Sequence, residues 1–322
     1  MALRIRESIV KTWSSQTERQ FGIDNPLRIK IESAAEETFL AMLELGIADG
    51  QLQTAANLAG LELESAERIL EQLRQIIEDF APPLATSELQ NLSFPIRESF
   101  RRRQQAVVLV PELDRLGKLL IHSLAHSGIG KIIVSDGTLI NESDCGRLGY
   151  PRELIGNSKL SVIKSELANA PSKVKLDNRM GWADYTEVDI AVVPANGVFR
   201  PIDYQRWLSL GTTHIGICFS DKHVLVTGVI DEGSACLGCR ELNKWDKDQS
   251  QKMIGSQIAG ISGMRDSASL LFAASLATQR IIQRIELGNH GTDTKFFFDG
   301  ETKSLSEVTN PACGCQQSLG EI

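Results

Sequence analysis

The sequence predicts an α/β protein in which a mainly parallel sheet with helices on both faces follows a small α+β module. From residue 106 onward, short apolar runs typical of buried strands alternate with amphipathic helical patterns, as in parallel sheets. Before that point, three extended stretches are followed by three helical patterns. A length of 322 residues fits about two domains of ~150 residues each.

The small module is expected at residues 1–80. Its extended stretches lie within residues 3–31 and read LRIRESIVKTW, RQFGID and LRIKI. Its helical patterns cover residues 33–46, 51–60 and 64–80. Ser33 with Glu36 three residues later is a capping-box pattern that starts the first helix. Strands followed by three helices are typical of a winged-helix-like module.

The charge of this module argues against DNA binding. Residues 1–90 contain 8 Lys and Arg and 15 Asp and Glu, a net charge of −7, whereas DNA binding depends on cations that neutralise phosphates. The whole chain also has a formal charge of −7, so no overall basic field attracts nucleic acid or a membrane surface. A solvated accessory domain and a peptide-binding domain both stay open as interpretations.

A linker is expected at residues 81–105, where a Pro- and Ser-containing stretch ends in the basic run Arg101–Arg103. Such a run is typical of a solvated face, and a phosphate-facing role is the alternative. The α/β domain then covers residues 106–322. Its predicted strands are 106–110, 131–136, 188–195, 213–219 and 295–299, and its predicted helices are 116–128, 160–170 and 269–288.

The composition points to a cytoplasmic protein. The first ten residues, MALRIRESIV, contain charges where a signal peptide needs an apolar core. The most apolar helical stretch, SASLLFAASLAT, is shorter than the roughly 20 residues that span a bilayer. Four of the six cysteines are paired, as a CxxC at 236–239 and a CxC at 313–315. In a chain of this length, paired cysteines favour a metal site over disulfides.

The stretch 106–160 resembles the adenylate-forming ThiF/MoeB/HesA superfamily, the bacterial relatives of ubiquitin-activating enzymes. Asp136 ends the second predicted strand, Arg147 follows eleven residues later, and Lys159 twelve residues after that. The resemblance implies that Asp136 binds a ribose and that Arg147 and Lys159 face a triphosphate. Gly117 matches the last glycine of the family's G-x-G-x-x-G loop, where it packs the helix.

Two departures from the family pattern count against ATP and magnesium as cofactors. Glu112 and Asp114 stand at the first two glycine positions of the loop, where side chains keep a phosphate away from the helix start. In the stretch VDIAVVPANG, Asp189 matches the family's first Asp, but Asn196 or Val193 stands where a magnesium-binding carboxylate is expected. Whether the chain is still an enzyme is therefore open.

The paired cysteines also fit the resemblance, because the family holds a structural zinc on two CxxC pairs, the second of which is shortened here to CxC. The four expected ligands are Cys236, Cys239, Cys313 and Cys315. Four thiolates form a closed tetrahedral site that supports the fold and does no chemistry itself. Reduced thiols or a redox pair are the alternative. Cys218 is expected in the core, and Cys145 is a weak candidate for an acyl-carrying nucleophile.

The layout of the whole chain is similar to actinobacterial ThiF-family proteins, the leader-peptide-binding partners of thiazole/oxazole-modifying peptide systems. There the first module resembles a PqqD-like element that takes up a leader peptide as an added strand. The resemblance implies a peptide or small protein as partner and a homodimer. Two functions stay open: a non-catalytic binding partner, and an ATP-dependent adenylyltransferase that activates a peptide or ubiquitin-like C-terminal carboxylate.

Overall fold

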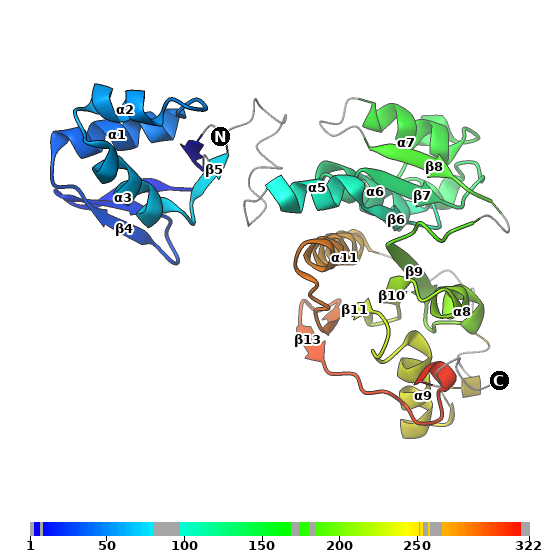
Figure 1. The fold of residues 1–322 in the computed structure, drawn as a ribbon. Helices are drawn as coiled ribbons and strands as arrows, with labels where there is room; N and C mark the ends of the chain where they lie inside the picture. Colours follow the sequence, from blue (N-terminus) through cyan, green and yellow to red (C-terminus); the bar gives the residue numbers. More distant parts are fainter. Residues whose placement is uncertain are drawn as a thin grey trace. The chain divides into compact units, whose positions relative to one another are not determined.

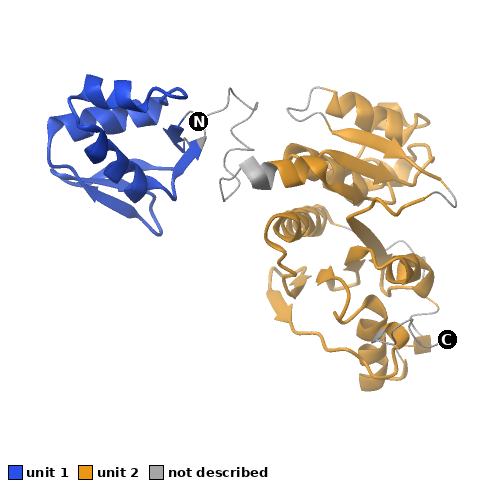
Figure 2. Cartoon of the chain, viewed as in Figure 1, with its two compact units in different colours: residues 1–100 blue, residues 101–322 orange. Residues whose placement is uncertain are grey.

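The computed structural model describes residues 3–6, 9–79, 97–168, 174–180, 184–250, 252–253, 257 and 266–316. The chain forms two compact units, residues 1–100 and residues 101–322 (Figure 2). No helix in this described part of the chain is both long enough and apolar enough to span a bilayer.

Unit 1 contains a three-stranded antiparallel sheet and three helices around one core (Figure 1). The sheet has the order β2-β3-β4, with β2 at Lys11–Ser15, β3 at Glu18–Phe21 and β4 at Leu27–Lys30. The helices are α1 (Ala34–Leu45), α2 (Leu52–Ala59) and α3 (Leu63–Leu73). The order of strands and helices follows the prediction, except that the first predicted stretch divides into β2 and a separate strand, β1 (Leu3–Ile5), in another sheet.

The predicted N-cap of α1 is confirmed, but the reciprocal half of the capping box is not. The Ser33 side chain accepts a hydrogen bond from the Glu36 N–H at 3.2 Å, which satisfies one backbone donor of the first turn. The Glu36 carboxylate accepts from the Glu32 N–H at 2.7 Å, one residue before the N–H that a capping box uses. Gly46 and Gly60 follow α1 and α2 directly, both with positive φ.

The predicted end of the third helix is wrong. The sequence places it at residue 80, but α3 ends at Leu73 and residues Ile77–Asp79 form β5, which pairs with β1 (Leu3–Ile5). The pair places Ile77 opposite Ile5, a fully buried residue. Apolar spacing at 76 and 77 fits a helix as well as a strand, and a partner some 70 residues away is invisible to local periodicity.

Unit 2 is built on an eight-stranded sheet whose five consecutive strands β8, β7, β6, β9 and β10 are parallel. Their bounds are Lys175–Asn178, Lys131–Val134, Val107–Leu109, Ile190–Asn196 and Thr213–Phe219. The antiparallel strands β11 (His223–Ile230), β12 (Asp293–Phe297) and β13 (Thr302–Leu305) extend the β10 edge. The mainly parallel sheet is confirmed.

Helices cover both faces of this sheet, as predicted (Figure 1). Alternate residues of a strand point to opposite faces, so Ile190 and Val192 of β9 pack into one core while Ala191 and Val193 pack into the other. The first core also receives residues of α6 (Arg115–His126), α7 (Lys159–Leu167) and α11 (Ser267–Leu287), and the second those of α8 (Pro201–Ser209) and α9 (Leu237–Lys247).

The expected linker is partly helical, and one of its arginines is not solvated. Helix α5 covers Arg97–Gln105, and residues 80–96 lie outside the described part of the chain. The Arg103 guanidinium lies 2.6 Å from a carboxylate oxygen of Glu286, and each side chain is 4% exposed. Neither a solvated face nor a phosphate-facing role therefore applies to Arg103, because this ion pair fixes α5 to the last turn of α11.

Candidate functional site

The loop between β6 and α6 is held in place from both sides at Leu113. Its N–H donates to Asp136 Oδ2 at 2.7 Å, and its carbonyl oxygen accepts from the Tyr150 hydroxyl at 2.8 Å. Tyr150 is fully buried, and the Lys118 ammonium lies 4.7 Å from the centre of its ring. The loop that contains Glu112 and Asp114 is therefore rigidly positioned, because two buried partners fix its middle residue.

A carboxylate of the chain itself caps the N-terminus of α6. Asp114 Oδ1 accepts the Gly117 N–H at 2.9 Å. A Cβ atom at Gly117 would lie 1.8 Å from the carbonyl oxygen of Glu112, so only glycine fits there. A helix N-terminus attracts anions through its free N–H groups and its dipole. In the ThiF-like pattern a phosphate would lie at this helix start, but here the Asp114 carboxylate occupies it.

Asp136 lies just beyond β7 and accepts two backbone hydrogen bonds. Its Oδ1 accepts from the Thr138 N–H and its Oδ2 from the Leu113 N–H, both at 2.7 Å. Burial raises its pKa, but the hydrogen bonds from Thr138 and Leu113 and the charge of Lys159 outweigh that effect, so the pKa is lowered overall. Asp136 is thus an ionised carboxylate at the strand end, and each oxygen has further acceptor capacity.

The two basic residues of the resemblance lie in different surroundings. Lys159, the first residue of α7, forms an ion pair of 2.9 Å with Asp144, and both side chains are below 10% exposed. Asp144 also accepts the Asn141 N–H at 3.0 Å. Arg147 is exposed in the following turn, and within the described part of the chain it forms no ion pair. Only Arg147 therefore presents its charge to solvent, because Asp144 neutralises Lys159.

A pocket of about 210 Å³ lies between the ends of β6 and β9. These strands are neighbours in the sheet but not in sequence, and such a switch point is where parallel α/β sheets bind ligands. The lining residues are Glu112, Pro194, Ala195, Asn196, Val198, Arg200 and Asp203. The volume is below the roughly 300–1,000 Å³ of pockets for drug-sized ligands.

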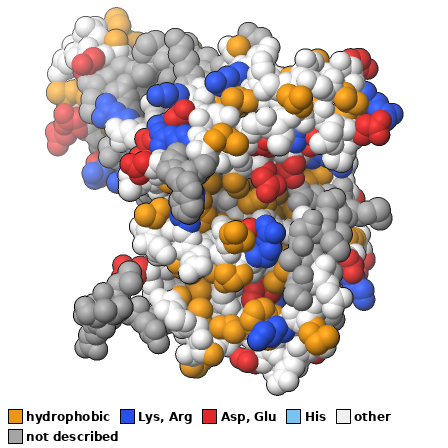
Figure 3. Space-filling view, turned by 90° about the vertical axis from the view of Figure 1, so that its right-hand side faces the viewer, with side chains coloured by type: hydrophobic (Ala, Val, Ile, Leu, Met, Phe, Trp, Pro, Cys, Tyr) orange, Lys and Arg blue, Asp and Glu red, His pale blue; other side chains and the backbone are white. Residues whose placement is uncertain are grey.

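The charges in this pocket are mostly paired. Arg200 donates two hydrogen bonds to Asp203, at 2.7 and 2.8 Å. These bonds raise the Arg200 pKa, and the negative charge of Glu112 raises it further, by a smaller amount. Asn196, at the end of β9, adds a neutral amide where a magnesium carboxylate is expected. One cation and two carboxylates therefore line the pocket. On the face drawn in Figure 3, acidic side chains lie beside basic and hydrophobic ones.

The four predicted zinc ligands converge. The sulfur of Cys236 lies 3.8 Å from that of Cys239 and 3.5 Å from that of Cys313, and the sulfurs of Cys239 and Cys315 are 3.4 Å apart. All four sulfurs lie within 4.8 Å of one another. A tetrahedral site with Zn–S bonds of about 2.3 Å needs sulfurs about 3.8 Å apart. The donor set and its spacing therefore fit a structural zinc ion.

Local structure explains how both pairs present their sulfurs. Cys236 is the N-cap of α9, and its sulfur accepts the Cys239 N–H at 3.4 Å. The shorter CxC pair follows a turn in which the Cys313 N–H donates to the Asn310 carbonyl at 2.9 Å. The Asn310 side chain donates to Asp246 on α9 at 2.7 Å. The tail is thus held on α9 by hydrogen bonds as well as by the cysteines.

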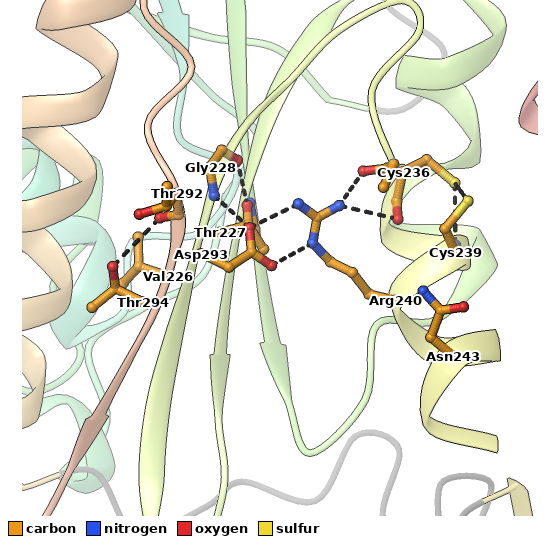
Figure 4. Close-up of polar contacts among 12 residues, drawn as sticks. Val226, Thr227, Gly228, Cys236, Cys239, Arg240, Asn243, Thr292, Asp293 and Thr294 are labelled. Carbon is orange, nitrogen blue, oxygen red and sulfur yellow. Dashed lines mark hydrogen bonds and ion pairs between the residues drawn. The ribbon is translucent and has the colours of Figure 1, made fainter. Parts of the chain in front are cut away.

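A buried ion pair connects the cysteine cluster to the sheet (Figure 4). Arg240 follows Cys239 directly and donates two hydrogen bonds to Asp293, at 2.7 and 2.8 Å. The same guanidinium also donates to the Cys236 carbonyl at 3.2 Å. Asp293 Oδ1 accepts the Gly228 N–H at 2.7 Å. The cluster, α9 and strands β11 and β12 therefore share one polar network.

Sequence reasoning missed three charged partners. Asp144 lies three residues before Arg147 in the loop already singled out, Asp203 lies three residues after Arg200, and Asp293 pairs with Arg240. The i, i+3 spacing of Arg200 and Asp203 was a usable signal. The other two pairs depend on tertiary contact. Cys218 is buried as predicted, and burial raises its pKa to about 12, which makes it inert.

No family model and no curated protein matches the sequence. Solved structures do match. Escherichia coli MccB with ATP has 17% identity and a TM-score of 0.64, covering 98% of this chain and 99% of that chain. The microcin C7 biosynthetic enzyme MccB with N-formylated MccA has 16% identity and a TM-score of 0.66, covering 98% and 100%. PaaA has 16% identity and a TM-score of 0.60, covering 80% and 97%.

These likenesses extend over both units of the chain, since the MccB matches cover nearly all of it. Identities of 16–17% show the fold and do not extend to the chemistry. The chain therefore shares the fold of MccB and PaaA, and the fold expected from the resemblance to the ThiF/MoeB/HesA superfamily is confirmed.

Proposed function

We propose that this chain is a non-catalytic, zinc-containing partner that binds a peptide or small protein in a peptide-modification system. The observation that carries the proposal is the Asp114 carboxylate at the N-terminus of α6, where a nucleotide enzyme of this fold needs a phosphate. The fold itself is consistent with peptide recognition, because a matched structure is MccB in complex with the peptide MccA.

Electrostatic repulsion from Asp114 should weaken ATP binding by an amount that can be worked out. Two like charges about 4 Å apart near a protein surface repel by about 4 kcal/mol at an effective dielectric constant of ~20. A phosphate beside Asp114 would meet that repulsion, which corresponds to roughly a thousandfold in affinity. Glu112 lines the adjoining pocket and adds a second negative charge. The Lys159 ammonium offers little compensation, because it is already paired with Asp144.

The N-terminal module supplies the proposed peptide site. Its sheet β2-β3-β4 has two edges without a strand neighbour among the described residues. An extended peptide can add to such an edge through backbone hydrogen bonds, with specificity from alternate side chains. The acidic charge of the module does not oppose this mode, because backbone pairing needs no basic surface.

Zinc on Cys236, Cys239, Cys313 and Cys315 would tie the C-terminal tail to α9 and the sheet. We place the protein in the cytoplasm, where thiolate ligands stay reduced. We also expect a homodimer, which light scattering on size-exclusion fractions tests directly.

An ATP-dependent adenylyltransferase is the alternative function. It is favoured by the ionised Asp136 at the end of β7 and by the exposed Arg147, both at the spacing of the family pattern. A matched structure is MccB with ATP. In this alternative a partner would have to supply the magnesium carboxylate that Asn196 does not provide.

Titration calorimetry with MgATP on zinc-loaded protein separates the two functions. We expect no binding at millimolar ATP. The double variant Glu112→Gly with Asp114→Gly removes both charges and both side chains from the helix start, and we expect it to gain measurable ATP binding. Glu153→Gly, at an exposed carboxylate of the 3-10 helix Arg152–Leu154, serves as the control and should gain none. Tight binding by the wild type, with pyrophosphate exchange, would instead establish the enzyme.

A further inference from the structure

Resting on the proposed peptide binding, we infer that the peptide pairs with β4 and has a specific charge pattern. In this pattern, two acidic residues of the peptide, two positions apart, stand opposite Arg28 and Lys30. The peptide residue between them is apolar. The inference follows from which edge of the small sheet is regular, which backbone groups point outward, and which side chains flank them.

The β4 edge is the regular one. Strand β2 pairs with β3 through a shifted register between Trp13 and Ser15, a bulge-like irregularity. Bulges at sheet edges disturb the ladder and discourage further pairing. Strand β4 pairs with β3 in unbroken register, from Leu27 opposite Phe21 to Lys30 opposite Glu18. An added strand therefore finds an undistorted template at β4 and not at β2.

The outward backbone groups of β4 are those of Arg28 and Lys30. The Ile31 N–H donates to the Thr17 carbonyl oxygen at 2.8 Å, toward β3. Backbone direction alternates along an antiparallel ladder, so Ile29 also faces β3 while Arg28 and Lys30 face away. An added strand would take its hydrogen bonds from these two residues, which places two peptide residues directly opposite them.

Side chains then set the pattern on the two faces. Arg28 and Lys30 are exposed on the outer face, whereas Ile29 is 5% exposed on the inner face toward the core. Opposite residues of neighbouring strands share a face and lie with their Cβ atoms about 5 Å apart. The peptide residues opposite Arg28 and Lys30 therefore meet cations, and the residue between them meets apolar surface.

The acidic net charge of the module argues for a basic peptide, so the two effects must be weighed. At physiological salt the Debye length is about 8 Å, and direct cross-strand pairs lie well inside it. Two carboxylates of unit 1 already lie near Lys30. Glu18 stands directly opposite it on β3, and Glu32 lies 3.9 Å from its ammonium with both side chains more than 60% exposed. The Arg28 guanidinium instead donates to the neutral amide oxygen of Gln20 at 3.0 Å. The cations of β4, Arg28 above all, therefore set the expected preference for acidic peptide residues.

Fluorescence anisotropy with two synthetic peptides on the full-length protein tests the inference. One labelled peptide has Glu-Leu-Glu at the centre of a Thr/Val-rich strand, and the other has Lys-Leu-Lys in the same place. We expect the first to bind more tightly. The double variant Arg28→Glu with Lys30→Glu should weaken it about tenfold or more and reverse the preference. Lys11→Glu, on the irregular β2 edge, is the matched control and should change neither.

The outcomes separate the inference from the proposal beneath it. Wild-type preference for the Lys-Leu-Lys peptide, or an unchanged preference in the β4 variant, would overturn the charge pattern and leave peptide binding intact. Failure of both peptides to bind the wild type would overturn strand addition as well. Circular dichroism melts of the variants check that unit 1 stays folded, which the exposed positions of Arg28 and Lys30 favour.

Discussion

Removing Asp293 tests how the cysteine cluster is coupled to the sheet. Its carboxylate accepts two hydrogen bonds from Arg240 and one from the Gly228 N–H, and the exposed fractions of the Arg240 and Asp293 side chains are 7% and 2%. In the Asp293→Ala variant, the buried Arg240 guanidinium keeps its charge without a counterion. Breaking one side of a buried ion pair costs about 3–5 kcal/mol.

The loss is expected in both stability and metal retention. About 4 kcal/mol corresponds to a fall in melting temperature of roughly 8–16 °C for a unit of this size. Arg240 also donates to the Cys236 carbonyl, so a chelator should remove zinc faster from Asp293→Ala than from the wild type. Chemical denaturation followed by circular dichroism measures the first effect, and a colorimetric zinc-release assay measures the second.

Two further variants show whether the cause is the buried charge. Arg240→Met combined with Asp293→Leu removes both charges and should recover most of the stability, because apolar replacements of buried pairs are often neutral. Glu142→Ala breaks an exposed pair with Arg152, at 3.8 Å and with both side chains more than 70% exposed, and should cost under about 1 kcal/mol. A loss of that small size in Asp293→Ala would refute the reasoning.

Three other predictions follow from single sites. Gly117→Ala should destabilise unit 2 by about 2 kcal/mol or more, because its Cβ would lie 1.8 Å from a backbone oxygen. At Gly137 the nearest atom to an added Cβ is 3.6 Å away, so Gly137→Ala should be nearly neutral, and thermal melts compare the two variants. Cys236→Ser should abolish binding of the one expected zinc ion per chain and lower the melting temperature. Elemental analysis and a thermal melt measure the two effects, and retained zinc with an unchanged melt would contradict the prediction. Burial lowers the His214 pKa to about 4, below its unfolded value near 6.5. The unfolded state therefore binds the extra proton, and the free energy of unfolding should fall as the pH drops from 6.5 to 4. His214→Gln should flatten this pH dependence in urea titrations, and an unaltered slope would count against the prediction.

The candidate nucleotide residues show why spacing alone did not decide their role. Asp136, Arg147 and Lys159 stand at the positions of the family pattern, and Asp136 lies at a strand end as expected. Spacing could not show that Asp144 neutralises Lys159, because that pair forms only when the loop folds against α7. Likewise, Arg103 belongs to a basic run in sequence, but its partner Glu286 is 183 residues away.

The sequence by itself determined the α/β class, the order of most strands and helices, the four converging cysteines and the charge that replaces the loop glycines. These features rest on local patterns: residue periodicity, caps, and residue types at fixed spacing. Only the tertiary structure decided that residues 77–79 pair with β1, that Asp144 neutralises Lys159, and that Arg240 joins the cysteine cluster to Asp293. Each of these depends on backbone direction or on contact between distant segments, which no local pattern encodes.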